Sequence, residues 1–598
     1  MHLIPGLIDK LFKQITKAHG SEILQSWERW LLSQSKFFYY LNELRIKWDV
    51  FDNNRRYSNW LRKQSIVNAE SIIPFNDPGL SSAVVSIFLL AGKDNFSRLE
   101  LTLSSISQQR GSKWKLFIIY PHDLKISPII NETNIPKNLY PYQDNISQIE
   151  TLNRIIEQDT GDFVTFITSG DILAPNALSE VIHFFNQDKQ VDVVYTDEDQ
   201  IDGRGKRGSP LFKPGWSPDL FLSYPYLGHL TVYRKESIRR MVEFHQYPIL
   251  VSEYDLLLRI VLDAKQVAHL PMLLYSRYSI NPTFHPAQQG ALKSAIHHEE
   301  SSATVEFVPD SPGYSRIHWP LKNSPLISIL ICTRDKADYL HKCLSSIFEK
   351  SIYPNYEVVL IDNGSREERT KALFATWQAK EPSRIHFYSV DTPFNFSGLN
   401  NLAVTHAKGE LVLFLNNDIE VISPNWLEEM GAQAQRPSIG AVSAMLLYPN
   451  KTVQHAGIIV GGPSMAVHGH HRFPVHSPGY MGRLLVASNY SAVTAACMMI
   501  RKDTFLTHGG FDENLAISYG DVEFCLRLRQ VGYYHVVLPY IQLYHHESIT
   551  RGYEDTEEKL ARMNAEKNYV LNRWPELLRQ DNFYHSSLQE TGNFMIKA

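Results

Sequence analysis

The feature that most constrains the fold of this chain is an internal duplication. Five stretches of the first half recur in the same order in the second half, which indicates that one structural unit is used twice. The apolar stretches are short and rich in β-branched residues, as strands are. The paired stretches are VVSIFLLAGKDN (84–95) with LISILICTRDKA (326–337), LTLSSI (101–106) with KCLSSI (342–347), GDFVTFI (161–167) with GELVLFL (409–415), VYRKES (232–237) with MIRKDT (499–504), and EYDLLLR (253–259) with DVEFCLR (521–527).

Each copy has the pattern of an α/β domain. Short apolar runs alternate with stretches of helical periodicity, which is typical of a sheet built from βαβ units. At 598 residues the chain exceeds what one hydrophobic core supports. We therefore expect two tandem α/β domains, at 79–285 and 324–560, joined by a polar linker at 286–323. Residues 1–78 are expected to form a helical segment, and residues 561–598 a helical tail.

Composition indicates which classes of protein this chain can belong to. With 43% hydrophobic residues, 20% charged residues and a net charge of −4, the chain resembles an ordinary globular protein. A nucleic-acid partner would favour a strongly basic domain, and the composition does not indicate one. Its four cysteines have no CxxC spacing, which fits a reducing compartment. No signal-peptide pattern occurs, and no apolar run reaches the roughly 18 residues of a spanning helix. These features predict a cytoplasmic protein, with peripheral contact at the inner face of the cell membrane as an open alternative.

The two copies differ where their strands end. The second copy has polar residues there that the first copy has lost, and open α/β sheets bind ligands at the C-terminal ends of their strands. Because the apolar framework survives in both copies, the polar ends of the second copy point to a site rather than to simple solvation. The pairs, second copy first, are Asp362 with Tyr120, Asn416-Asn417-Asp418 with Thr168-Ser169-Gly170, Asp521 with Glu253, and His545 with Ser276.

The polar residues of the second copy have distinct chemical uses. Asp418 and His545 offer an oxygen and an imidazole to a divalent cation, which would keep open positions for phosphate oxygens. Asp362, just after a strand, suits a hydrogen bond to a ribose or base. Asp521 opens DVEFCLRLR at an expected helix N-terminus. It could accept a proton from an incoming hydroxyl, or it could simply cap the helix.

These residues resemble family 2 glycosyltransferases of the GT-A fold, in particular the tandem-domain enzymes of bacterial O-antigen and capsular polysaccharide assembly. The resemblance implies two tandem GT-A domains, a nucleotide-diphospho-sugar transferase architecture that is Rossmann-like, and it covers most of 324–560. Residues 160–277 resemble the first domain of the same architecture. The matching stretches are PLISILICTRD, YEVVLIDNGS, PFNFSGLNNLAVTHAKGELVLFLNNDIEV, SAVTAACMMIRKDTF, GGFDENLAISYGDVEFCLRLRQVGY and LYHHESITRG, and in the first domain VYTDEDQID, FKPGWSPDL and YDLLLR.

The resemblance implies an inverting, metal-dependent transfer of a hexosyl or deoxyhexosyl group. The sugar would pass from a nucleotide-sugar donor to a hydroxyl of a growing cell-surface glycan. Asp521 would be the general base, Glu523 would contact the acceptor, and Asp418 with His545 would hold Mg²⁺ or Mn²⁺. The donor-binding residues would be Thr333, Asp335, Asp362, Asn400, Asn416 and Asn417. The acceptor would be a glycan, with a polyprenyl-linked oligosaccharide as one candidate.

The sequence departs from the family pattern in two places. Asn416 stands at the first position of the DxD metal motif, so fewer charges would hold the ion. The first copy lacks most active-site acids, and we expect it to be non-catalytic, with acceptor positioning or domain packing as its role. A second transferase activity that uses Glu253 is the alternative.

Several residues bear on alternative functions. A non-catalytic carbohydrate-binding or scaffold protein of a polysaccharide assembly complex is the alternative for the whole chain. A processive membrane synthase is disfavoured, because Val570 stands where a QxxRW motif ending in Arg573-Trp574 would need Gln. The histidines of VHGHHRF favour a glycine-containing loop over the donor site rather than zinc ligands. The acids in VYTDEDQID are expected to be solvated turn residues.

Overall fold

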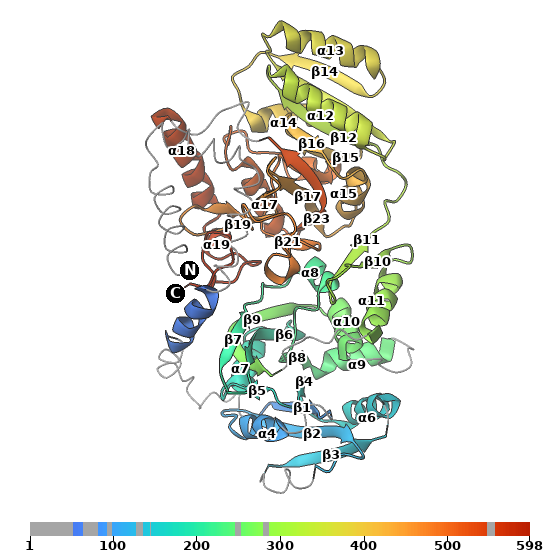
Figure 1. Ribbon diagram of the computed structural model, residues 1–598, viewed down its shortest axis with the longest axis vertical. Helices are drawn as coiled ribbons and strands as arrows, with labels where there is room; N and C mark the ends of the chain where they lie inside the picture. The colour runs from blue at the N-terminus through green and yellow to red at the C-terminus, as the bar shows by residue number, and fades with distance from the viewer. Residues whose placement is uncertain are drawn as a thin grey trace, which may run out of the picture. The chain divides into compact units, whose positions relative to one another are not determined.

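The computed structural model describes residues 52–63, 82–92, 98–126, 135–143, 145–244, 253–278, 286–546 and 556–597. Contacts divide the chain into two compact units. The first copy takes in Asn54–Ser217 and Tyr224–Ser315, and the second copy takes in Pro218–Ser223 and Arg316–Met595. Figure 1 shows a separate sheet in each unit, coloured blue to green in the first copy and yellow to red in the second.

The sheet of the first copy has the strand order β3-β2-β1-β4-β8-β6-β9-β5, and β7 pairs with β6. Strands β1 to β4 pair in parallel, β8 runs antiparallel to its neighbours, and β9 pairs in parallel with β6. The strands are β1 (Val84–Leu90), β2 (Lys113–Pro121), β3 (Lys137–Tyr142), β4 (Phe163–Thr168), β5 (Ile172–Leu173), β6 (Val193–Ile201), β7 (Arg207–Leu211), β8 (Thr231–Arg234) and β9 (Val267–Arg277).

The sheet of the second copy repeats this order as β14-β13-β12-β15-β22-β17-β23-β16. Each pairing has the same sense as its counterpart in the first copy. The prediction of a duplicated α/β unit is therefore confirmed. The strands are β12 (Ile327–Thr333), β13 (Tyr356–Asn363), β14 (Ile385–Val390), β15 (Leu411–Leu415), β16 (Ile419–Val421), β17 (Ile439–Leu447), β18 (Val453–His455), β19 (Ile458–Val460), β20 (Ala466–His468), β21 (Ser488–Tyr490), β22 (Cys497–Arg501) and β23 (Tyr534–His545).

One pair of small residues explains part of the sequence repeat. In the second copy, Gly409 donates its N–H to Ser328 Oγ at 2.8 Å, and a Cβ on Gly409 would lie 2.5 Å from the Leu326 carbonyl oxygen. In the first copy, a Cβ on Gly161 would lie 2.2 Å from Ser86 Oγ. The chain entering β15 or β4 thus passes too close to the neighbouring strand for a larger residue. The glycine at the start of GELVLFL and GDFVTFI is needed for the fold.

The central strands of each sheet are buried, whereas the edge strands β3 and β14 are largely not. Every residue of β13, β15 and β17 is buried. This explains the continuous rather than alternating hydrophobic runs. The helices are α4 (Leu99–Ser107), α6 (Asn145–Gln158), α7 (Ala177–Gln187), α9 (Lys235–Phe244), α10 (Glu253–Asp263) and α11 (Pro286–Glu299) in the first copy, and α8 (Pro218–Ser223), α12 (Ala337–Lys350), α13 (Glu368–Lys380), α14 (Phe396–His406), α15 (Trp426–Ala434), α16 (Lys502–Thr507), α17 (Gly520–Gln530), α18 (Glu557–Arg573) and α19 (Pro575–Arg579) in the second.

The segments expected outside the two domains differ in part from the prediction. The polar linker expected at 286–323 contains α11 and two short strands, β10 (Thr304–Phe307) and β11 (Ser315–His318). Its PAQQGALKSAIHHE stretch consists largely of good helix formers, which explains why this segment is helical. Of the helical segment predicted at 1–78, residues 52–63 are helical, and most of the rest lies outside the described residues. No helix in the described part of the chain combines the length and hydropathy needed to cross a bilayer.

The expectation for VYTDEDQID was wrong for three of its four acids, whereas Asp202 is an exposed turn residue. Asp197, Glu198 and Asp199 lie in β6, and each is at most 3% exposed. They are buried because each has a partner: Lys213 Nζ donates to Glu198 at 3.0 Å, His269 Nε2 lies 2.9 Å from Asp197, and Arg207 Nε donates to Asp199 at 2.6 Å. Burial alone would raise the pKa of the Glu198 carboxyl, but the charge of Lys213 outweighs it and holds that pKa below its usual value. The acids belong to the core of the first copy.

Candidate active site

Strand pairing brings Asp418 and His545 together. The turn after β15 is closed by a hydrogen bond from the Ile419 N–H to the Asn416 carbonyl oxygen at 3.3 Å. β16 then pairs antiparallel with β23, and Ile419 lies opposite His545. Asp418, directly before Ile419, is thereby placed with its Oδ1 atom 3.3 Å from His545 Nε2. Two residues that are 127 positions apart in the chain become neighbours at one edge of the sheet.

The residues at this edge fit a divalent cation. Asp418 is 5% exposed, and its Oδ1 atom has no hydrogen-bond partner among the residues described. A buried carboxylate oxygen without a partner is costly, and such a group calls for a ligand or an ion. His545 Nε2 also lies 3.3 Å from Asn416 Nδ2. One carboxylate oxygen and one imidazole nitrogen at this spacing are a donor set that Mg²⁺ or Mn²⁺ accepts.

The neighbouring strand end is tied to the same loop. Asn417 Nδ2 donates to Thr333 Oγ1 at 2.8 Å, which joins the turn after β15 to the end of β12. Thr333 lies opposite Asp362 in the pairing of β12 with β13. Asp362 Oδ1 accepts from the Ser365 N–H at 3.0 Å, so this carboxylate closes the turn that follows β13. A side-chain hydrogen bond thus links the ends of β12 and β15, and the end of β13 lies beside them in the sheet.

Asp521 lies in the first turn of α17 and uses its two carboxylate oxygens differently. The residue that precedes the helix is Tyr519, in a left-handed conformation with φ of 65°, and its side chain makes no capping hydrogen bond. Asp521 Oδ1 accepts from the Val522 N–H at 2.9 Å, which satisfies one donor of the first turn, and Oδ2 accepts from the Ala495 N–H at 3.0 Å. Capping thus accounts for one of the two oxygens. The carboxylate is fixed beside the loop that leads into β22.

Most of the predicted site residues line one cavity of about 770 Å³. Its lining takes in seven predicted residues, namely Thr333, Asp335, Asn416, Asn417, Asp418, Asp521 and His545. It also takes in residues that the sequence analysis did not single out, among them Arg334, Lys336, Gln454, Thr494, Lys559 and Arg562. His468, from the glycine-containing VHGHHRF loop, lines it as well. The basic residues on α18 could have been found from their helical spacing of three, directly after the LYHHES stretch.

Asp335 and Asn400 have structural partners. Asp335 Oδ1 accepts from the backbone N–H groups of Arg366 and Glu367 at 2.7 and 2.8 Å. The hydrogen bond from Glu367 is the largest cause that lowers the pKa of this carboxyl. Asn400 is 2% exposed within α14, and its Nδ2 atom donates to the Phe396 carbonyl oxygen at 2.8 Å. Asp362, Asn400 and Glu523 are not part of the cavity lining.

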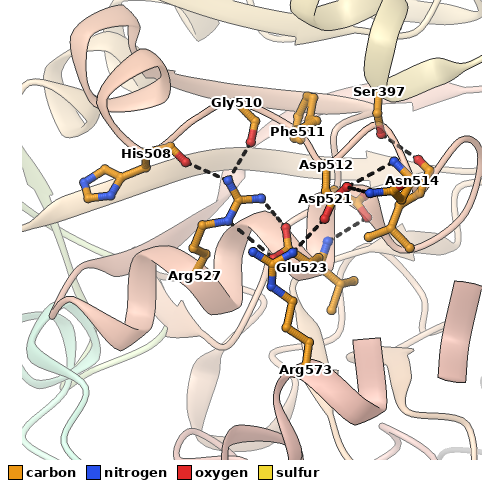
Figure 2. A network of polar contacts seen from close by, with 12 residues as sticks. Ser397, His508, Gly510, Phe511, Asp512, Asn514, Asp521, Glu523, Arg527 and Arg573 are labelled. Carbon is orange, nitrogen blue, oxygen red and sulfur yellow. Dashed lines mark hydrogen bonds and ion pairs between the residues drawn. The ribbon is translucent and has the colours of Figure 1, made fainter. Parts of the chain in front are cut away.

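Glu523 lies at the centre of a polar network. Its side chain is fully buried. It accepts hydrogen bonds from Arg527 and, at 3.2 Å, from Trp574 Nε1, and Arg573 Nε lies 3.4 Å away. Figure 2 shows the guanidinium groups of Arg527 and Arg573 both directed at Glu523. This placement ties the carboxylate to helices of the protein and does not support direct contact with an acceptor.

Comparison with known proteins decides the family. Residues 328–506 match the family model described as Glycosyl transferase family 2. The second copy is a family 2 glycosyltransferase domain. Its match begins within β12 and ends within α16, so it contains the metal-binding candidates Asn416 and Asp418 of the glycosyltransferase domain. The duplicated α/β sheets, together with this match, confirm the predicted fold class of tandem GT-A domains.

The relatives of this chain are longer than the chain itself. It is 36% identical over 460 residues to Uncharacterized protein y4gI of Sinorhizobium fredii (strain NBRC 101917 / NGR234), across 75% of this chain and 50% of that protein. It is 34% identical over 474 residues to O-antigen biosynthesis protein RfbC of Myxococcus xanthus, across 75% of this chain and 36% of that protein. The chain thus spans half or less of each relative. A similar solved structure is Mannosyltransferase PcManGT from Pyrobaculum calidifontis in complex with GDP-Man and Mn²⁺, with 17% identity, 43% of this chain and 66% of that chain covered, and a TM-score of 0.32.

Proposed function

We propose that the second copy transfers a sugar from a nucleotide-sugar donor to a glycan hydroxyl, with inversion at the anomeric carbon. The observation that carries this proposal is that one cavity contains Asp418, His545 and Asp521. Asp418 and His545 would provide a cation site, and Asp521 would provide a carboxylate whose Oδ2 atom lies beside the loop that leads into β22. A single displacement needs a base on the acceptor side and stabilisation of the leaving group on the other.

The donor side is built from the ends of these three neighbouring strands. Asp418 and His545 would hold Mg²⁺ or Mn²⁺, and Asn416 beside them adds no charge. When bound, the ion would neutralise charge that develops on a departing diphosphate. Thr333, Asn417, Asp335 and Asp362 remain our candidates for contacts to the nucleotide. For Asn400 the support is the sequence resemblance alone.

The acceptor side rests on Asp521. Its carboxylate would accept the proton of the acceptor hydroxyl while that oxygen forms a bond to the anomeric carbon. The bond between the anomeric carbon and the diphosphate oxygen breaks in the same step, and the electron pair leaves with the diphosphate. The hydrogen bond from the Ala495 N–H to Oδ2 holds the carboxylate in place during this transfer.

The biological setting is also a proposal. One relative is named an O-antigen biosynthesis protein, and the chain matches 36% of that protein's length. We assign the same class of product to this chain, a cell-surface glycan of the O-antigen or capsule type. The acceptor would be carried on a polyprenyl lipid and modified on the cytoplasmic side of the membrane. The first copy would position the acceptor without catalysing transfer.

The test is nucleotide binding by the purified chain. Thermal unfolding would be measured with UDP, GDP, dTDP and CMP, each with and without Mn²⁺ or Mg²⁺. A ligand at 100 times its dissociation constant stabilises the folded state by roughly 2.7 kcal/mol. We expect one nucleotide to raise the melting temperature in a metal-dependent way. No shift with any of them would favour the alternative of a carbohydrate-binding or scaffold protein.

A further inference from the structure

Helix α18 contributes two basic residues to the cavity of the glycosyltransferase domain. Lys559 and Arg562 both belong to its lining and are three positions apart, so they lie on the same side of the helix. Each is only partly exposed. The cavity also contains the carboxylates of Asp418 and Asp521, so the two basic residues face a site that already carries negative charge.

A diphosphate in this cavity would need more positive charge than one cation supplies. The carboxylates of Asp418 and Asp521 would repel it, and repulsion between close charges is strong away from bulk water. Lysine and arginine bind phosphate oxygens through charge-assisted hydrogen bonds, with arginine able to make two in parallel. Lys559 and Arg562 are the residues of α18 that can supply this charge.

Buried side chains on one side of α18 fix the position of this helix. Glu566 is 5% exposed and accepts from the backbone N–H groups of Ile517 and Ser518 at 3.1 and 2.8 Å. Ile517 itself lines the cavity. Val570, one turn further along α18, is fully buried. The segment that leads into α17 is therefore attached to the middle of α18.

The C-terminal end of α18 is attached through Asp512 and Glu523. Asp512 Oδ2 accepts from Tyr569 Oη at 2.8 Å and from Arg573 Nη1 at 2.7 Å. Glu523 joins Arg573 and Trp574 to α17, only two positions after Asp521, as Figure 2 shows for the two acids and Arg573. One helix thus carries the candidate base and, through Glu523, holds the helix that carries the two basic residues.

We propose that Lys559 and Arg562 bind the diphosphate of the donor, and that Glu523 is a positioning residue that holds α18 against α17. This inference rests on the proposed function, because it names the groups that recognise the leaving group at the same site. It gives Glu523 a role in donor binding rather than acceptor binding.

The test compares nucleotides that differ by one phosphate. The full chain would be titrated with UDP and UMP, GDP and GMP, and dTDP and dTMP in the presence of Mn²⁺. The ratio of diphosphate to monophosphate affinity reports on contacts to the terminal phosphate. Lys559→Ala and Arg562→Ala should each lower this ratio about tenfold, the loss expected for a hydrogen bond to a charged group. Lys567→Ala is the matched control, because Lys567 lies on α18 outside the cavity lining and donates to the Pro463 carbonyl oxygen.

Glu523→Gln should lower the same ratio while monophosphate affinity stays constant. A merely structural role would weaken both ligands equally or neither. Asp512→Asn is a second variant that loosens the same end of α18, in case Glu523→Gln does not fold. A ratio unchanged in Lys559→Ala and Arg562→Ala overturns the inference while leaving the proposed function in place. Wild-type protein that binds CMP but no diphosphate also overturns it, and wild-type protein that binds no nucleotide overturns the proposed function itself.

Discussion

The two copies share one sheet topology, yet they use their buried acids in opposite ways. In the second copy, Asp418 Oδ1 is buried without a hydrogen-bond partner among the described residues and lines a cavity. In the first copy, Asp171 follows the equivalent strand and is 2% exposed. Its Oδ2 atom accepts from Tyr275 Oη at 2.6 Å, and its Oδ1 atom accepts from the Tyr278 N–H at 2.8 Å. Burial raises the pKa of the Asp171 carboxyl.

The difference lies in whether the buried acids have partners within the protein. Asp197, Glu198 and Asp199 of the first copy are matched with basic partners, as a stable core requires. Asp418 and Asp521 of the second copy are positioned by the backbone but keep capacity for a ligand. Acids satisfied within the protein stabilise it, whereas an acid left unsatisfied is available to bind a cation or a proton.

The largest expected effect in the second copy is that of Asp521→Asn. Asparagine keeps an oxygen that can accept from the Ala495 N–H, but it cannot take a proton from the acceptor. We expect the rate of sugar transfer to fall about 10²–10⁴-fold, the usual contribution of a general base. The measurement is product formation under single-turnover conditions, with nucleotide binding as a check that the donor site persists. Asp503→Asn, at an exposed carboxylate, is the control. Transfer at more than a tenth of the wild-type rate would remove Asp521 from the role of base.

The counterpart in the first copy is Glu198→Gln, which tests whether its acids are structural. The Lys213 side chain is fully buried, so loss of its charged partner leaves a buried ammonium group without compensation. We expect unfolding to require about 3–5 kcal/mol less free energy. Urea unfolding of the full chain measures this loss, with exposed Glu157→Gln as the control. Normal stability would mean that the pair contributes nothing to the core of the first copy.

Asp418→Ala asks whether the unsatisfied oxygen of the second copy holds the metal. Removal of the carboxylate should abolish the metal-dependent part of nucleotide stabilisation, which is roughly 2.7 kcal/mol at 100 times the dissociation constant. Calorimetric titration of the nucleotide with and without Mn²⁺ measures it. The same change at the matched acid of the first copy, Asp171→Ala, should leave this metal dependence unchanged. If metal dependence survives in Asp418→Ala, the ion is held elsewhere.

Much of the fold could be predicted from the repeat. The repeat predicted that GDFVTFI corresponds to GELVLFL and VYRKES to MIRKDT. The structure has the same antiparallel strand pair in both copies, with Phe163 opposite Arg234 and Leu411 opposite Arg501. The short β-branched runs were enough to identify the strands. It was not enough for VYTDEDQID, because the partners of these acids come from other strands and loops.

The site residues that follow strands could be predicted from the sequence, whereas those on helix α18 could not. Asn416 to Asp418 stand directly after a strand, so the sheet rules placed them at the ligand-binding edge. Lys559 and Arg562 reach the cavity only because α18 packs on the segment before α17 through Glu566. Glu523 is likewise occupied by contacts with Arg573 and Trp574, which are 50 and 51 positions later in the chain. Such long-range packing leaves little trace in local spacing.

Gly170→Asp would test the comparison from the other side. The ungapped sequence repeat aligns Gly170 with Asp418, but strand pairing places Asp171 there, because Ile172 lies opposite Ser276 as Ile419 lies opposite His545. The change therefore adds a second acid beside Asp171. The backbone at Gly170 has φ of +99°, and a Cβ there would lie 3.5 Å from the Cβ atoms of Arg98 and Tyr278. We expect a loss of about 1–3 kcal/mol in unfolding free energy from backbone strain, and no gain of Mn²⁺ binding. Thermal unfolding measures the loss. Gly208→Asp is the control, because its Cβ would enter open space without a positive φ. A variant that gains metal binding would show that the first copy lost its site through this one residue.

The smallest effect is expected for Glu253→Gln, at the position in the first copy that the sequence aligns with Asp521. The side chain of Glu253 lies outside what the structure describes, so this prediction rests on the comparison of the copies. A base has no use without a donor site beside it. The first copy has Ser276 where the second has His545, and its counterpart of Asp418, Asp171, accepts hydrogen bonds from Tyr275 and Tyr278. Sugar transfer by the full chain should therefore stay within about twofold of wild type, a change of less than 0.5 kcal/mol in the activation barrier. Assays of the product should include its linkages as well as its amount. Loss of one linkage while another persists would assign a second transferase activity to the first copy and would end the contrast between a structural and a catalytic domain.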